Sequence, residues 1–109
     1  MGKTNIKQCR FSVAISHLIL FADNLGYGLT YGDAADTNKN DGHMKNSNHH
    51  VRLAVDLNLI LDRGKGQYIR ESTHPAWGEL HSYWENHLGG APMIISDANH
   101  FSFEHNGNY

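Results

Sequence analysis

The sequence predicts a single α+β domain, because two segments repeat their apolar residues every three or four positions and two others alternate them. The chain has 109 residues, which suits one compact domain over residues 1–109. Its apolar fraction of 39% and charged fraction of 18% exclude a disordered chain. Nine histidines, as many as Lys and Arg combined, suggest a metal or proton-transfer site.

The first helix is predicted over residues 5–25. Thr4 or Asn5 can cap it, because a short polar side chain accepts hydrogen bonds from the first amides of a helix. Gly26 suits the left-handed position that ends a helix. One face of this helix is apolar and is expected to pack in the core: Phe11, Ile15, Leu18, Ala22 and Leu25.

Three strands are expected in the middle of the chain. Residues 28–32 form a short strand candidate, and the polar segment 33–47 is a predicted loop. Residues 53–61 alternate apolar and polar side chains, so the leucines face a helix and Asp56 lies on the opposite face. The turn-forming residues 62–66 then predict a hairpin that returns over residues 67–70.

A second helix is predicted over residues 75–88, with Pro75 in its first turn and Gly89 and Gly90 after its end. Its apolar stripe, which includes both tryptophans, is expected to be core: Trp77, Leu80, His81, Trp84 and Leu88. Residues 100–104 alternate again, with Phe101 and Phe103 on one face and His100 on the other.

Two separate strands therefore each present a candidate metal ligand on a polar face, Asp56 and His100. Catalytic zinc takes three protein ligands from His and Asp or Glu and leaves a fourth position for water. His49 is a candidate for the third ligand. Asp97, three residues before His100, is placed to exchange a proton with that water.

Residues 47–56 have the form SxHxxxxAxD, and residues 97–100 have the form DxxH. Together and in this order they resemble the zinc peptidases of the M15 family. They are most similar to small phage peptidoglycan peptidases (endolysins) and to VanY-type carboxypeptidases. The stretches RLAVDLNLI, THPAWGELHSYWENHLGG and DANHFSFEHNG extend the resemblance over most of the chain from about residue 25 to 108.

The resemblance implies that His49, Asp56 and His100 bind Zn²⁺ and that Asp97 is the catalytic acid/base. It also implies the fold of Hedgehog-type and D-Ala-D-Ala peptidases, in which an antiparallel sheet with helices on one face carries the zinc. The implied reaction is hydrolysis of the peptide stems of peptidoglycan, at the L-alanyl-D-glutamate bond or at a bond next to D-alanine.

The chain departs from the family pattern at three positions, one of which is Asn99, where members often have an aromatic residue or Pro. Arg52 stands where the classical motif has Gly, and Asp36 stands where many members have an Arg that holds a substrate carboxylate or the developing oxyanion. That substrate-binding role can pass to Arg52, Lys45 or His43, or be lost.

Two alternative functions follow from the same residues. One is a relative that binds zinc and the cell wall without catalysis, as the missing upstream Arg allows. The other is a metal-dependent nuclease of the His-Asn-His kind, suggested by the many His and Asn. Such a nuclease needs a basic surface, whereas the net charge here is −2. It also packs its ligands into one ββα unit, whereas Asp56 and His100 are expected on separate strands.

The remaining expectations concern location and partners. The N-terminal segment lacks the features of a signal peptide and is too short to span a membrane. We therefore expect a protein made in the host bacterial cytoplasm that acts on the cell wall, as a monomer without a separate wall-binding module. We expect no nucleic-acid partner and no stable membrane association. The single Cys9 excludes an internal disulfide and a Cys-rich zinc scaffold.

Overall fold

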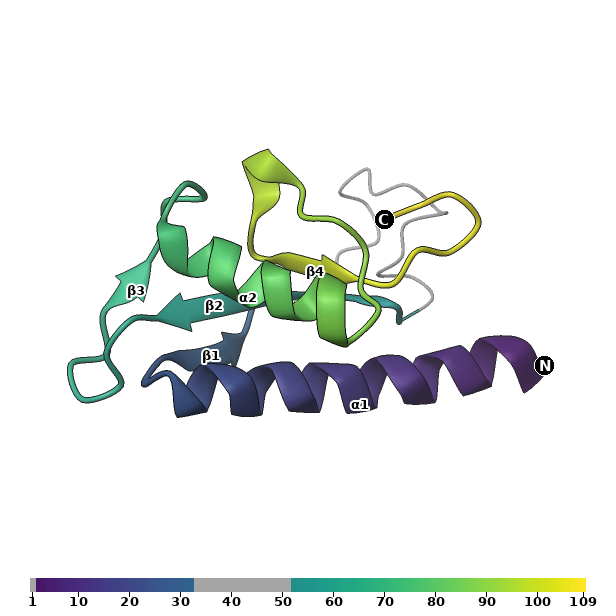
Figure 1. Cartoon of the computed structure of the whole chain (residues 1–109), viewed down its shortest axis with the longest axis horizontal. Helices are drawn as coiled ribbons and strands as arrows, with labels where there is room; N and C mark the ends of the chain where they lie inside the picture. The colour runs from purple at the N-terminus through teal and green to yellow at the C-terminus, as the bar shows by residue number, and fades with distance from the viewer. Residues whose placement is uncertain (1, 33–51) are drawn as a thin grey trace, which may run out of the picture.

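The computed structural model describes residues 2–32 and 52–109, and it confirms an α+β fold with two helices and an antiparallel sheet (Figure 1). In chain order the elements are α1 (Gly2–Asn24), β1 (Gly28–Tyr31), β2 (Ala54–Ile60), β3 (Tyr68–Ile69), α2 (Pro75–His87), the short 3₁₀ helix η1 (Ile95–Asp97) and β4 (His100–Ser102).

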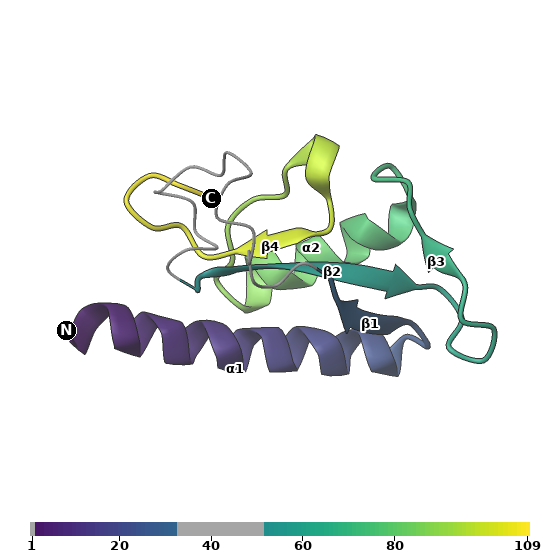
Figure 2. The same cartoon turned by 180° about the vertical axis from the view of Figure 1, so that it is seen from behind.

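Strand β2 is the centre of the sheet, and every other strand pairs with it in antiparallel orientation. Its second half pairs with β1, from Leu57 opposite Tyr31 to Ile60 opposite Gly28. Its last two residues also pair with β3, and its first three pair with β4. The segment before α2 and the segment after it are thereby brought to the same strand, as Figure 2 shows from the sheet side.

The core lies between the sheet and both helices. Alternate side chains of β2 and of the residue before it point into this core, where Leu53, Leu57 and Leu59 are fully buried. Helix α1 contributes Phe11, Ile15, Leu18 and Ala22, and helix α2 contributes Ala76, Trp77, Leu80 and Trp84. The predicted apolar stripes are confirmed except at Leu25, and Leu88 packs partly buried against the core just after the end of α2. A helix with one apolar face gains stability by burying that face.

The predicted limits of α1 need two corrections. The helix begins at Gly2, before the expected caps at Thr4 and Asn5, and it ends at Asn24. Leu25 follows the last helical residue and is 43% exposed, so it does not join the apolar face. Gly26 has a φ of +88°, which confirms the left-handed position after the helix.

Helix α2 begins as predicted, with Pro75 in its first turn and the Nδ1 atom of His74 accepting a hydrogen bond from the Ala76 amide at 3.1 Å. At its other end the indole of Trp84 donates to the carbonyl of Ser102 at 3.0 Å and thereby links the helix to β4. The backbone at Gly90 passes so close to this indole that a Cβ atom there would lie 1.9 Å from the Trp84 Nε1. Glycine is therefore required at this close approach.

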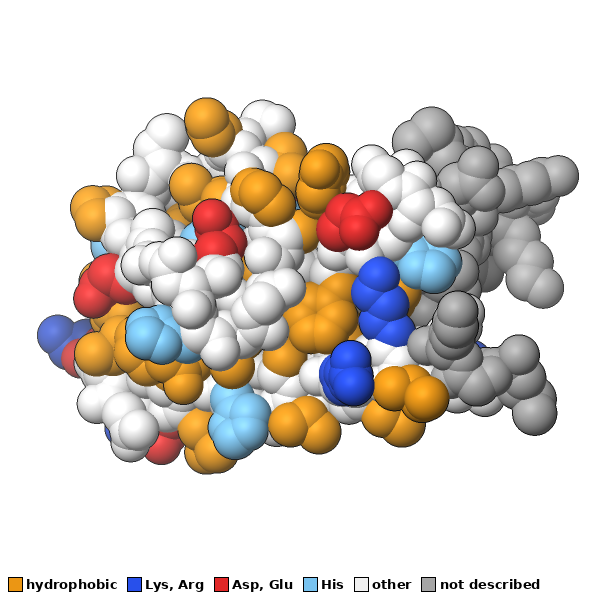
Figure 3. Space-filling model, turned by 45° about the vertical axis from the view of Figure 1, so that its right-hand side comes forward, with side chains coloured by type: hydrophobic (Ala, Val, Ile, Leu, Met, Phe, Trp, Pro, Cys, Tyr) orange, Lys and Arg blue, Asp and Glu red, His pale blue; other side chains and the backbone are white. Residues whose placement is uncertain are grey.

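Among the residues that the structure describes, no helix is long and apolar enough to cross a membrane. On the face shown in Figure 3, the described Lys and Arg side chains lie interspersed with acidic, histidine and apolar ones.

Candidate metal centre

The register of β2 and β4 brings two predicted ligands together. Asp56 lies directly opposite His100. The amide of Leu57 donates to the carbonyl of Asn99 at 2.9 Å, which makes Asp56 and His100 a non-hydrogen-bonded pair. Side chains of such pairs are the closest across an antiparallel sheet. Accordingly, the Nδ1 atom of His100 lies 3.4 Å from the Oδ1 atom of Asp56.

Asp97 reaches the same place from another segment. It is the last residue of η1, and the turn at Ala98 and Asn99 leads from it into β4. One ligand atom from each of Asp56, Asp97 and His100 lies within 4.8 Å of the other two. His100 is buried, Asp56 is partly buried and Asp97 is exposed, so the centre opens to solvent on the side of Asp97.

The carboxylates change the electrostatics of the imidazole. Burial is the largest single influence on the pKa of His100 and lowers it, whereas the hydrogen bond and the negative charge of Asp56 raise it. A hydrogen bond to the backbone of Tyr109 and the charge of Asp97 act in the same direction, and the pKa of His100 lies above its ordinary value of 6.5. The centre therefore favours a positive charge at the position of the imidazole.

This group of residues could hold a metal ion, and the chemistry of its donors suits zinc. Zinc takes imidazole nitrogen and carboxylate oxygen at about 2 Å, so two of its ligands in a tetrahedron lie roughly 3.3 Å apart. The 3.4 Å between His100 and Asp56 matches that separation. Asp97 adds a carboxylate on the open side.

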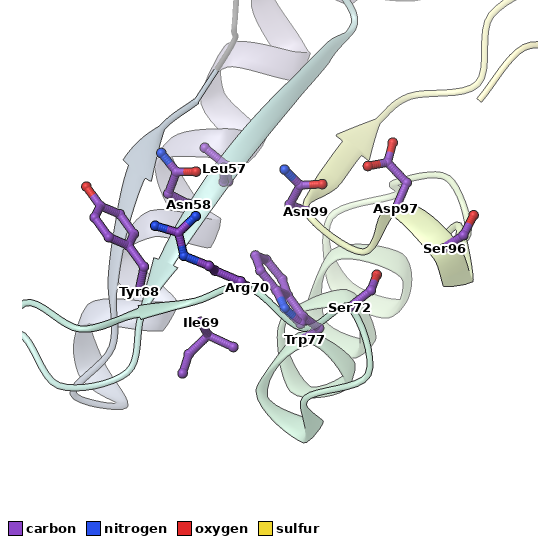
Figure 4. Close-up of a pocket in the computed structure, with 10 residues that line it drawn as sticks. All are labelled: Leu57, Asn58, Tyr68, Ile69, Arg70, Ser72, Trp77, Ser96, Asp97 and Asn99. Atoms are coloured by element: carbon purple, nitrogen blue, oxygen red, sulfur yellow. The ribbon is translucent and has the colours of Figure 1, made fainter.

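A cavity of about 510 Å³ adjoins this centre and shares Asp97 with it. Its walls come from β2, β3, the start of α2 and η1, and the residues that line it are Leu57, Asn58, Tyr68, Ile69, Arg70, Ser72, Trp77, Ser96, Asp97 and Asn99. In Figure 4, Asp97 and Asn99 lie on one side of the cavity, and Asn58 and Tyr68 lie on the other side. The side chain of Arg70 lies between these two sides. A cationic group and two amides thus line the space beside Asp97.

The other predicted site residues lie elsewhere or outside the described ranges. His49, proposed as the third ligand, falls in residues 33–51, as do His43 and Lys45, and lies outside the residues that the structure describes. Arg52 lines a different cavity, of about 310 Å³, together with residues of α1 and β1. It is not among the residues that line the cavity beside Asp97.

Three residues near the centre were not singled out as functional by the sequence. Arg70 lies in a short return strand region with no motif around it, and its place in the cavity depends on the pairing of β3 with β2. Ser72 and His81 contact the turn between Asp97 and His100. Only His81 carried a signal, because a histidine within the apolar stripe of α2 needs a buried hydrogen-bond partner.

The chain matches no known family model, no curated protein and no solved structure.

Proposed function

We propose that this protein is a zinc-dependent peptidase that hydrolyses the peptide stems of bacterial peptidoglycan. The observation that carries the proposal is the meeting of Asp56, Asp97 and His100 beside a polar cavity. These are three of the four residues that the SxHxxxxAxD and DxxH motifs assign to the centre. Asp56 comes from β2, about 40 residues before the segment of η1 and β4 that carries Asp97 and His100.

In this proposal His49, Asp56 and His100 hold the zinc, and the domain has the fold of Hedgehog-type and D-Ala-D-Ala peptidases. The sheet supports this arrangement, since an antiparallel sheet with both helices against the core side of β2 leaves Asp56 on the other side. When bound, zinc would polarise the scissile carbonyl and lower the pKa of a water molecule.

Asp97 is the proposed acid/base. Its exposed carboxylate lies near Asp56 and His100 and also lines the cavity, so it can take a proton from an attacking water molecule. The same carboxylic acid then donates this proton to the nitrogen of the leaving amine. Water thereby adds across the amide bond, giving one carboxylic acid and one amine.

The cavity supports a substrate that carries a negative charge. Both bonds implied by the resemblance have a free carboxylate on the carbon attached to the leaving nitrogen. The guanidinium of Arg70 can bind such a carboxylate, and the amides of Asn58 and Asn99 can bind peptide groups. Arg70 thus takes the substrate-binding role that the sequence offered to Arg52, Lys45 or His43.

The test is mass spectrometry of muropeptides released from purified peptidoglycan by the wild-type protein and by Asp97→Asn. We expect zinc-dependent cleavage that a chelator abolishes and that Asp97→Asn reduces by about 100- to 10,000-fold, the usual contribution of a general base. Asp62→Asn is the matched control, because Asp62 lies exposed in the turn after β2, away from the centre.

Zinc titration of the same variants separates the roles of Asp97. Retained zinc with lost cleavage supports an acid/base, whereas lost zinc makes Asp97 a ligand and contradicts its proposed role. A wild-type protein that binds zinc and peptidoglycan but releases no new amino groups from any wall type contradicts the peptidase, and supports the binding-only relative.

A further inference from the structure

The backbone of Ala98, between Asp97 and His100, is held from two sides. Its amide donates a hydrogen bond to the Oγ atom of Ser72 at 2.8 Å. Its carbonyl oxygen lies 2.7 Å from the Nε2 atom of His81. Since a carbonyl only accepts, Nε2 carries the proton of this hydrogen bond. Both polar backbone atoms of one residue are therefore bonded to side chains from other parts of the chain.

The imidazole of His81 is itself firmly placed. It is 2% exposed, and its ring stacks on that of Phe101 with the centroids 4.1 Å apart and the planes 11° from parallel. Its Nδ1 atom makes no hydrogen bond within residues 2–32 and 52–109. The hydrogen bond from Nε2 to Ala98 therefore has to offset the free-energy cost of burying this polar ring. His81 thus contacts the chain on both sides of His100, at Ala98 and at Phe101.

Ser72 forms hydrogen bonds to the segment that leads into the same turn. Besides accepting from Ala98, its hydroxyl donates to the carbonyl of Ile95 at 2.9 Å. Ile95 is the first residue of η1, and Asp97 is its last. A helix of three residues has little stability of its own, so these contacts decide where the exposed Asp97 lies.

We infer that His81 is a positioning residue of the metal centre, which fixes the Ala98 peptide so that Asp97 and His100 face Asp56. This inference rests on the metal centre of the proposed function. The register of β2 and β4 places the backbone of His100 opposite Asp56. His81 holds the chain on both sides of the His100 ligand, by its hydrogen bond to Ala98 and its stacking on Phe101, and this contact links His81 to Zn²⁺ affinity. The position of Asp97 follows from the turn that His81 and Ser72 hold.

The test compares Zn²⁺ affinity and stability in His81→Asn and His81→Gln. The amide nitrogen of Gln lies near the position of Nε2 and can donate to Ala98, whereas the shorter Asn side chain does not reach it. We expect His81→Asn to bind Zn²⁺ roughly 10-fold more weakly, as for other residues that orient metal ligands, and His81→Gln to stay within about threefold of wild type. His87→Asn is the matched control, an exposed histidine of the same helix.

Hydrogen exchange gives a second readout that a general loss of stability does not mimic. In the metal-free protein, the Ala98 amide should exchange faster in His81→Asn and in Ser72→Ala, while the amides of β1 and β2 keep their protection. Urea unfolding of the same samples, with zinc removed by a chelator, reports the change in stability separately.

Each outcome decides the inference. Weaker Zn²⁺ binding with rescue by Gln supports it. Unchanged Zn²⁺ affinity in His81→Asn, with only a lower stability, shows a purely structural histidine and overturns it while the proposed function stands. Equal weakening in His81→Gln and His81→Asn also overturns it. A wild-type protein that binds no Zn²⁺ overturns both proposals.

Discussion

The two faces of the β2–β4 pair differ in what their side chains contact. On the helix side, Leu57 and Phe101 are fully buried among apolar residues. On the other side, the side chain of Asp56 is 26% exposed and lies against His100. Because successive residues of a strand point to opposite faces, one short strand supplies both a core and a polar site. Substitutions on the two faces should therefore change different properties of the protein.

The two buried histidines show the same difference. Burial lowers the pKa of His81, and the hydrogen bond to Ala98 and the charge of Glu85 only partly oppose it. The pKa of His100 is raised instead, because burial, the largest single influence, is outweighed by the hydrogen bonds and negative charges around the ring, first among them those of Asp56. Two buried histidines thus differ in basicity, with a lowered pKa on the core side and a raised pKa beside the carboxylates.

The largest expected effect is the loss of a ligand by Asp56→Asn. We expect Zn²⁺ affinity to fall roughly 100- to 1,000-fold, since one ligand carries a corresponding part of the binding free energy of a zinc site. The unfolding free energy of the metal-free protein should change by less than about 1 kcal/mol, because Asn keeps the size and a hydrogen bond. Calorimetric titration and urea unfolding measure the two. An unchanged affinity would remove Asp56 from the centre.

The opposite pattern is expected for Leu57→Ala, one residue along the same strand. Leu57 is fully buried, so its truncation should lower the unfolding free energy by about 3 kcal/mol. The folded fraction should bind Zn²⁺ with the affinity of the wild type within about threefold. Urea unfolding with and without Zn²⁺ tests this. A large loss of affinity in the folded fraction would show that the two faces are coupled.

A smaller effect is expected for Arg70→Gln in the cavity beside Asp97. Loss of one charged hydrogen bond should raise KM about 10-fold for stems with a free carboxylate and leave kcat nearly unchanged. Stems in which that carboxylate is amidated should show no difference between variant and wild type.

Arg10→Gln is the control for this experiment, because Arg10 lines an apolar cavity between α1 and the end of α2. An equal rise in KM for charged and amidated stems would contradict the role of Arg70 as a carboxylate ligand.

The smallest expected effect is the difference between the pKa values of His81 and His100. In the metal-free protein, NMR should place the pKa of His100 above 6.5 and that of His81 below it. His100 then stabilises the fold below pH 6.5, and this contribution is lost as the pH rises through its folded pKa. His81 acts with the opposite sign, because stability is lost as the pH falls from 6.5 through its lowered pKa. Asp56→Asn should lower the pKa of His100, and an unchanged titration would contradict the role of Asp56.

Much of the fold could be predicted from local patterns. The apolar stripes of both helices, the left-handed Gly26 and the placement of Asp56 and His100 on polar faces follow from periods of 3.6 and 2 residues. The helix start at Gly2 could not be predicted, because several residues before Asn5 tolerate a helical turn. The cavity beside Asp97 also could not, since it depends on how β3 and η1 meet around β2.

The sequence by itself determined which side chains are able to bind a metal and on which face of each strand they lie. Only the tertiary structure decided that Asp56 faces His100 and that Asp97 joins them. Alternation sets the face of a residue but leaves the register of two strands free, and pairing in register is established when the core side is buried. The same packing places His81 of the apolar stripe against Ala98, so that this histidine contacts the backbone of the site.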